Sequence, residues 1–381
     1  MRVEADKQLK PAAANRSRKL SEWAQWLEER QISLSFGLIA ALLAATHVYA
    51  PEPAVADGVS AAASSSLKAR LRALASHNPR TGLYAVGPGD LLLVLLVVLL
   101  LTGLRAAAMK LVLSPLAARW GVARPADATR FAEQAWMLLY YNIFWPFGMY
   151  LYCGSGYFLD MEALWTDWPR REIAGPMKAY TLAQLAFWAQ QVLVIHLERR
   201  RKDHAQMLGH HLVTVALITA AYAYHQTKVG NLIMVLMDVI DLFLPLAKCL
   251  KYLGFTWICD VLFGFFVLSW VGARHVLFLV TCWSVYADLP RLTPDACFRG
   301  SAGSLRAAEA EGWRRFWEPF ADPTGRVCFG RDVGNAFLVL LLALQAMMMV
   351  WFTFIVRIIV KIVQGHRAED VRSDSEEDED E

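Results

Sequence analysis

Four ionisable side chains lie within two apolar segments near the middle of this 381-residue chain. His210 and His211 are adjacent, and Asp238 and Asp241 follow three residues apart, in stretches otherwise made mostly of apolar residues. An ionisable group at the centre of a bilayer costs about 2.5–3.5 kcal/mol or more, so such groups are rare and mark functional sites. We therefore take these four residues as the candidate site.

Histidine and aspartate together support three chemistries in a dry pocket. An imidazole can act as a general base whose tautomer an aspartate fixes, it can itself accept an acyl group, or the four side chains can ligate a metal ion. The alternative without chemistry is that they are hydrogen-bonded contacts between helices. Because His210 and His211 lie about 100° apart around a helix, we expect one to react and the other to hold a partner.

The segments that carry these residues belong to a strongly apolar chain. Hydrophobic residues make up 56% of the sequence, and the mean hydropathy is +0.32. Runs of about 20 apolar residues indicate membrane-spanning helices, and the sequence therefore predicts an all-α polytopic membrane protein with about eight transmembrane helices, the fifth of them short. The expected spans are residues 32–50, 90–109, 132–151, 177–197, 210–225, 229–250, 257–280 and 335–361.

The distribution of charge orients these spans. The amino-terminal segment and the connections after the second, fourth and sixth spans are basic, whereas residues 152–176 carry four acidic residues against two arginines. Under the positive-inside rule this pattern places both termini in the cytosol. The connection 51–88 departs from the rule with four Lys or Arg residues, and a surface helix over residues 66–75 is expected there.

The fifth and sixth spans are joined by a few residues and form an antiparallel hairpin. Folding the chain about Thr227 places His211 at the depth of Asp241, within about one helical turn. Asp238 and Asp241 point to one side of their helix, and Lys248 continues that stripe toward the cytosol. The hairpin thus predicts that the histidines and aspartates share one site.

A basic run precedes the histidines on the cytosolic side. Its members are Arg199, Arg200, Arg201 and Lys202. One interpretation is a charge signal that fixes the orientation of the preceding span. The other is an entrance for a polyanionic substrate, such as a coenzyme A thioester with its phosphates.

The six cysteines contain no CxxC pair, and we expect no metal site. Cys297 and Cys328 both fall in the connection 281–334, which the expected topology places in the lumen. They are a candidate disulfide if that compartment is oxidising.

The chain divides into four expected parts. They are a basic cytosolic segment (1–31), the first two spans with their connections (32–130), a catalytic bundle (131–365) and an acidic tail (366–381). The tail is expected to be disordered. It is either a solvated end, or Ser373 and Ser375, which acidic residues follow, are sites for an acidophilic kinase.

The hairpin residues form a long collinear motif. It reads His210-His211-x-x-Thr214, Tyr222, Lys228-x-Gly230, Met237-Asp238-x-x-Asp241 and Lys248-x-x-x-Tyr252. This motif resembles the signature of the longevity-assurance ceramide synthases, within the TLC-domain superfamily, and the resemblance covers about residues 130–365. Animal members have histidine at the position of Met237. The methionine is similar to that of fungal members, and the run from Pro319 to Cys328 resembles fungal members too.

The resemblance implies a bundle of six to seven helices that enclose the active site, and a reaction. A long or very-long-chain acyl-CoA would acylate the amine of a sphingoid base, sphinganine or phytosphingosine, to give (dihydro)ceramide and free CoA. One of the paired histidines would be the base or the transient acyl acceptor, and the two aspartates would orient the histidines or the ammonium group of the sphingoid base. The basic run 199–202 would hold CoA phosphates, with Thr214, Tyr222 and Lys248 in support.

The resemblance also sets expectations for partners and location. Acyl-CoA is a co-substrate, and no cofactor is expected. The protein would be a multi-pass protein of the endoplasmic reticulum membrane in contact with membrane lipid, with no nucleic-acid partner. A small single-span accessory subunit is expected from the fungal relatives, and a homodimer is left open. The rival functions are a non-enzymatic lipid sensor and a lipid transporter, which internal repeats would favour.

Overall fold

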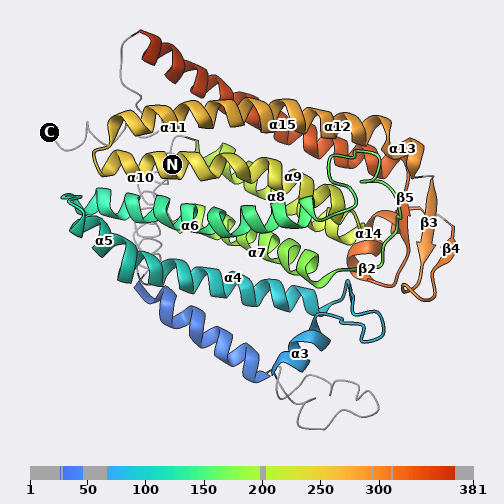
Figure 1. The fold of residues 1–381 in the computed structure, drawn as a ribbon. Coiled ribbons are helices and arrows are strands. Elements are labelled where there is room, and N and C mark those ends of the chain that lie inside the picture. Colours follow the sequence, from blue (N-terminus) through green and yellow to red (C-terminus); the bar gives the residue numbers. More distant parts are fainter. Residues whose placement is uncertain are drawn as a thin grey trace, which may run out of the picture.

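The structure is a computed structural model that describes residue 26 and residues 29–45, 67–197, 203–293, 295–309 and 312–364. This part of the chain is mostly helical, with long helices lying side by side (Figure 1). Its expected spans are helical over residues 29–45, α4 (Gly89–Ala107), α6 (Pro125–Cys153), α7 (Gly175–Leu197), α8 (His204–Ala223), α9 and α10 (Thr227–Asp238 and Phe243–Tyr252), α11 and α12 (Thr256–Ser269 and Phe278–Ala287) and α15 (Arg331–Val363).

Within the described residues, three continuous helical stretches are long and apolar enough by themselves to cross a membrane. They are Gly89–Arg119, Thr256–Leu292 and Arg331–Ile362. The chain is therefore a multi-pass membrane protein. Between α4 and α6 the helical path continues through η1 (Ala108–Leu113) and α5 (Ser114–Arg119). The expected surface helix is confirmed as α3 (Leu67–Leu74).

Two of the long helical paths change geometry beside the site. A 3₁₀ segment, η2 (Val239–Leu242), separates α9 from α10. Pro245 has no N–H to donate to the carbonyl of Asp241, so a regular α-helix cannot continue through this turn. A π-helical segment, η3 (Trp270–Leu277), separates α11 from α12. Such segments are frequent at functional sites.

Short strands correct the expectation of an all-α chain. At one end of the bundle β1 (Tyr84–Ala85) pairs with β2 (Glu172–Ile173). At the same end, β3 (Ala296–Arg299) lies between β4 (Arg306–Ala308) and β5 (Val327–Phe329), all antiparallel (Figure 1). These strands are too short to give the alternating pattern by which a strand is identified from sequence.

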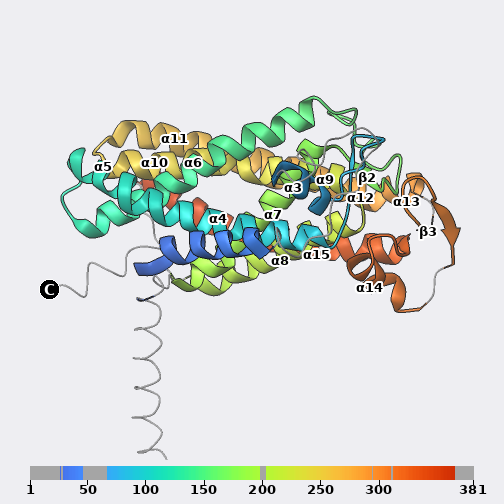
Figure 2. The ribbon, with the colours of Figure 1, turned by 90° about the horizontal axis from the view of Figure 1, so that it is seen from below.

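Helix α8, which carries the paired histidines, packs against α7, α9 and α15. Figure 2 shows the bundle turned by 90°, with the helix over residues 29–45 lying along α4 on its outer side. Gly103 of α4 allows this close approach, because a Cβ at that position would lie 3.0 Å from the side chain of Ser35. Small residues at helix contacts serve the same purpose in other membrane bundles.

Candidate functional site

The paired histidines occupy the buried face of α8. His210 and His211 are 8% and 6% exposed. The ring of His210 packs between Trp188 and Trp351, with centroid distances of 5.4 Å and 5.3 Å. The ring centroid of His211 lies 5.3 Å from that of the same Trp188. Aromatic rings rather than polar groups therefore hold the two imidazoles in place.

The histidine nitrogens have an unusual environment. The Nδ1 atoms of His210 and His211 are buried and have no hydrogen-bond partner among the described residues. In a Ser-His-Asp triad, a carboxylate binds this nitrogen and fixes the tautomer. No hydrogen bond between a histidine and an aspartate of the site occurs in the described structure, so this geometry is not that of a triad.

The first aspartate is bound by α7 instead. Asp238 is 1% exposed, and its Oδ2 accepts a 2.7 Å hydrogen bond from Nε2 of Gln184. The Oε1 atom of Gln184 accepts in turn from the hydroxyl of Tyr140 at 3.1 Å. The same Nε2 lies 3.2 Å from the hydroxyl of Tyr180. A network of hydrogen bonds thus connects the carboxylate to two helices behind the site.

The second aspartate is bound by an arginine. Nη2 of Arg274 lies 3.1 Å from Oδ2 of Asp241 and donates to the carbonyl of Met237 at 2.8 Å. Its guanidinium also stacks over the ring of Trp270, 4.7 Å from the centroid. The π-helical segment η3 carries both residues of this stack. The carboxylate and guanidinium together reduce the net charge that the apolar bundle has to bury.

Sequence reasoning missed Gln184 and Arg274. Arg274 had a signal: it is the single Lys or Arg residue in the expected span 257–280, and intramembrane charges mark function. Gln184 had none, because it is one of three glutamines in its helix and the sequence does not indicate which of them has a functional partner.

Two cavities of different character meet at the site. The larger, of about 730 Å³, has charged groups of both signs in its described wall. Its cationic groups include Arg105, Lys248 and Lys251, and its carboxylates are Glu133, Asp203, Asp241 and Asp260. The smaller, of about 80 Å³, has an almost wholly apolar wall. Among the residues that the structure describes, only Trp188, His210 and Arg274 line both cavities, whereas His211 lines the larger one alone. The arrangement allows a polar, charged group and an apolar chain to meet beside one imidazole.

The remaining predicted residues lie around this centre. Thr214 lines the apolar cavity, and its hydroxyl donates to the carbonyl of His210 at 2.9 Å. Tyr222 also lines that cavity, but its hydroxyl donates to Asp90 at 2.7 Å. Lys178 binds the same carboxylate at 2.7 Å, so this cluster anchors α4 to the bundle. Six of the predicted residues lie outside the described residues: Arg199, Arg200, Arg201, Lys202, Ser373 and Ser375.

The turn between α8 and α9 starts with a Schellman motif. His225 has φ of 58°, a left-handed conformation that histidine adopts more readily than most residues. Gln226 N donates to the carbonyl of Ala221 at 2.7 Å, and His225 N donates to Tyr222 at 3.2 Å. These bonds satisfy the last carbonyls of α8. They also place His225 and Gln226 beyond the helix.

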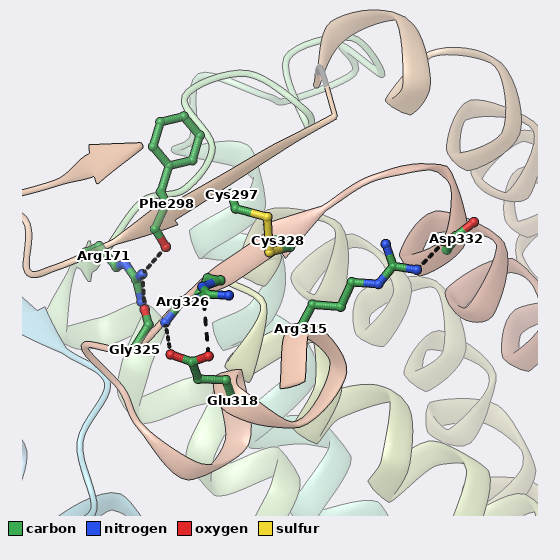
Figure 3. Close-up of a disulfide and its surroundings, with 9 residues drawn as sticks. All are labelled: Arg171, Cys297, Phe298, Arg315, Glu318, Gly325, Arg326, Cys328 and Asp332. Atoms are coloured by element: carbon green, nitrogen blue, oxygen red, sulfur yellow. Dashed lines mark hydrogen bonds and ion pairs between the residues drawn. A yellow bond between two sulfur atoms is a disulfide. The ribbon is translucent and has the colours of Figure 1, made fainter. Parts of the chain in front are cut away.

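The strands β3, β4 and β5 and the described residues between them form a small cap, within residues 295–309 and 312–330, and Arg171 links this cap to the turn. A disulfide joins Cys297 on β3 to Cys328 on β5 (Figure 3). The buried Arg171 donates to the carbonyls of Phe298 at 3.1 Å and Gly325 at 2.7 Å, and also to Nε2 of His225 at 3.2 Å. Burial and the adjacent guanidinium lower the pKa of His225 to about 3, so the imidazole stays neutral in the folded cap.

No three His, Cys, Asp or Glu residues in the described ranges lie close enough together to hold a metal ion. Metal ligation, the third chemistry open to the four site residues, therefore has no support from the geometry of the described residues.

Comparison with known proteins places this site in a family context. A sequence model of the TLC domain (TRAM_LAG1_CLN8) matches residues 130–357. Ceramide synthase FUM18 of Gibberella moniliformis is 47% identical over 308 residues, which are 80% of this chain and 72% of the relative. The sphingosine N-acyltransferase-like protein ALT7 of Alternaria alternata is 44% identical, covering 78% and 70%. Sphingosine N-acyltransferase lag1 of Schizosaccharomyces pombe is 37% identical, covering 80% and 73%.

Proposed function

The chain belongs to the TLC-domain family and, within it, to the fungal longevity-assurance ceramide synthases, and from this premise we propose how its site performs N-acyl transfer. The enzyme is a sphingosine N-acyltransferase: an acyl-CoA and a sphingoid base give a ceramide and free CoA. The observation that carries the proposed mechanism is the position of His210, which lines both the charged and the apolar cavity.

The two cavities divide the acyl-CoA between them in this proposal. The phosphates of CoA lie in the larger cavity, near Arg105, Lys248 and Lys251, because ammonium and guanidinium groups bind phosphate through charge-assisted hydrogen bonds. The basic run 199–202 immediately precedes α8 in the sequence and would add to this charge. The acyl chain enters the apolar cavity, so the thioester carbonyl comes to rest beside His210.

The expected span 257–280 contributes little to the apolar cavity: Arg274 is its only residue in the described wall. The walls of that cavity come mainly from α8, α9 and α15. Span 257–280 lines the charged cavity instead, through residues that include Phe263 and Phe266.

Two courses of reaction fit this arrangement. In the first, His210 removes a proton from the amine as the nitrogen attacks the thioester carbonyl, and the proton passes to the departing thiolate. In the second, the imidazole attacks the carbonyl and releases CoA, and the amine then takes the acyl group and restores the imidazole. The lack of a carboxylate partner for Nδ1 leaves the imidazole without the support a triad gives.

Arg274 and the aspartates would assist both courses. The guanidinium lines both cavities beside His210, where it would stabilise the negative charge that develops on the thioester oxygen. Asp238 lines the apolar cavity and would attract the ammonium of the sphingoid base. Neither course requires a cofactor, and removal of metal ions by a chelator should leave turnover unchanged.

The test uses membranes that contain the full chain, supplied with labelled sphinganine and acyl-CoA. His210→Ala should abolish ceramide formation, whereas Lys361→Gln, on α15 and outside both cavities, should retain it. Retained turnover in a folded His210→Ala protein would contradict the assignment. Mass spectrometry of the wild-type protein after incubation with acyl-CoA alone separates the two courses, because only the second leaves an acyl group on the protein.

The proposal extends to the topology and surroundings of the enzyme. We place it in the endoplasmic reticulum membrane with eight spans and both termini in the cytosol, which the alternation of basic connections supports. The fungal relationship supports a small single-span accessory subunit, and a homodimer is compatible with it. Labelling of single cysteines placed at residues 10 and 370 with a membrane-impermeant reagent tests the orientation of the termini.

A further inference from the structure

The apolar cavity follows one face of α8. The residues of α8 that line it are His210, Thr214, Leu217, Ile218, Ala221 and Tyr222. Spacings of three and four residues place these side chains along a single stripe. At the far end the cavity reaches Gln226, three residues beyond the end of α8. The helix alone spans about 20 Å from His210 to Ala223 at 1.5 Å per residue. An extended long acyl chain that starts at His210 would therefore point its methyl end at Gln226.

A third cavity, of about 560 Å³, begins at this end. Gln226 and Thr227 are the two residues that line both this cavity and the apolar one. Beyond them the walls are charged, with Asp167, Arg170 and Lys228 among the lining residues. An apolar chain gains free energy from apolar surroundings but not from charged, hydrated ones. The pair Gln226 and Thr227 is thus a boundary between two environments.

Gln226 is suited to this position by its burial and its polarity. It is 4% exposed, and its Nε2 atom is buried without a hydrogen-bond partner among the described residues. The Schellman motif at the end of α8 fixes its backbone, since Gln226 N donates to Ala221 and its carbonyl accepts from Gly230. A fixed backbone and a buried amide make the wall both rigid and unfavourable for further methylene groups.

Resting on the proposed ceramide synthase function, we infer that Gln226 and Thr227 form the end wall of the acyl site and set the longest acyl chain that the enzyme uses. Removing most of the Gln226 side chain joins the apolar cavity to the space beyond. Chains longer than the wild-type limit then gain room, while shorter chains keep all of their contacts.

A matched variant changes the same cavity in the opposite sense. Gly230 lines the apolar cavity one helical turn from Gln226. A Cβ at this position would lie 3.6 Å from Cβ of Ala221, which is ordinary contact, so Gly230→Ala narrows the cavity without a clash. Leu305 lines only the cavity beyond the wall, and Leu305→Ala serves as the neutral control.

The experiment measures kcat/KM of the full chain in membranes for saturated acyl-CoAs that differ by two carbons. The limit chain is the longest acyl chain that the wild-type enzyme uses. For Gln226→Ala, kcat/KM with the chain two carbons longer, divided by kcat/KM with the limit chain, should rise by about tenfold, the usual discrimination for added methylene groups. Gly230→Ala should shift the profile toward shorter chains, and Leu305→Ala should leave it unchanged. An unchanged profile in an active Gln226→Ala enzyme would overturn the inference.

A second measurement does not depend on the variant folding. An acyl-CoA at the wild-type length limit, with a diazirine at its terminal carbon, is crosslinked to the wild-type protein by light. Label on the peptide that contains residues 226 and 227 supports the end wall, and label elsewhere overturns it. If the wild-type enzyme makes no ceramide with any chain length, the proposed function fails instead, and the two failures are thus distinguished.

Discussion

Gln184 on α7 donates a 2.7 Å hydrogen bond to Asp238 on α9, and both side chains are buried. This contact joins two helices that both pack against α8, the helix of the histidines. It also determines what Asp238 is available to do, because Gln184 engages one of its carboxylate oxygens. The aspartate is therefore positioned by its neighbour rather than by the histidines that its sequence motif suggests.

Replacing Gln184 with leucine should leave Asp238 buried without its donor. We expect a loss of about 1–3 kcal/mol in stability, since a buried polar group without its partner bears the desolvation penalty. Thermal unfolding of detergent-solubilised Gln184→Leu and Asp238→Asn, singly and together, measures the coupling. Coupling below about 0.5 kcal/mol in the double-mutant cycle would contradict this pairing.

The ion pair between Arg274 and Asp241 should behave as a unit. Arg274→Gln leaves the carboxylate uncompensated in the bundle, and such changes destabilise proteins by about 3–5 kcal/mol. Adding Asp241→Asn removes the second charge and should restore folding but not ceramide formation, because the guanidinium is still missing from the site. Folded yield and turnover are measured on the single and double variants. Full activity in the double variant would remove Arg274 from the mechanism.

Substitution of the lysines in the charged cavity should weaken binding of acyl-CoA without changing the chemical step. We expect Lys248→Gln and Lys251→Gln to raise KM for acyl-CoA by about fivefold each, about 1 kcal/mol per partly exposed charge, with kcat almost unchanged. The KM of Lys361→Gln, a lysine outside the cavity, should match the wild type. Equal KM values in all three variants would place the CoA phosphates elsewhere.

The cap should lose stability in acid. His225 has a folded pKa of about 3 against about 6.5 in an unfolded chain, so an opened cap binds a proton that the closed cap does not. The stability of the cap is complete above about pH 6.5 and falls as the pH drops toward 3. Hydrogen exchange of residues 295–309 and 312–330 measures the opening. His225→Asn removes the titrating group, and the same pH dependence in that variant would assign the effect to another residue.

The disulfide should stabilise the same cap. Cys297 and Cys328 are 31 positions apart, and removing a native crosslink typically costs 2–5 kcal/mol, about 3–4 kcal/mol for a loop of this length. Cys297→Ser should therefore increase proteolysis of the cap under non-reducing conditions, whereas Cys153→Ser, at a free cysteine, should not. Equal cleavage of both variants and the wild type would show that the strand pairing alone holds the cap.

The positions of the helices were predictable from the sequence because apolar runs of membrane length have few alternative structures. Every expected span is helical where the structure describes it, except at Tyr224 and His225, which end the span 210–225. Three of the described stretches by themselves meet the length and composition of a membrane span. The five short strands of the described structure were not predictable, since each has two to four residues. Such strands form through pairing with distant segments rather than through their own pattern.

By itself the sequence determined which residues are buried at a cost in free energy, because ionisable groups in apolar helices can be recognised wherever they lie in the fold. These residues are His210, His211, Asp238 and Asp241. It also determined the family, through a long collinear motif. Only the tertiary structure decided the partners of these residues: Gln184 for Asp238, Arg274 for Asp241 and Trp188 for the histidines. Helical periodicity specifies the face on which a side chain lies, but the neighbour on the next helix depends on how all the helices pack together.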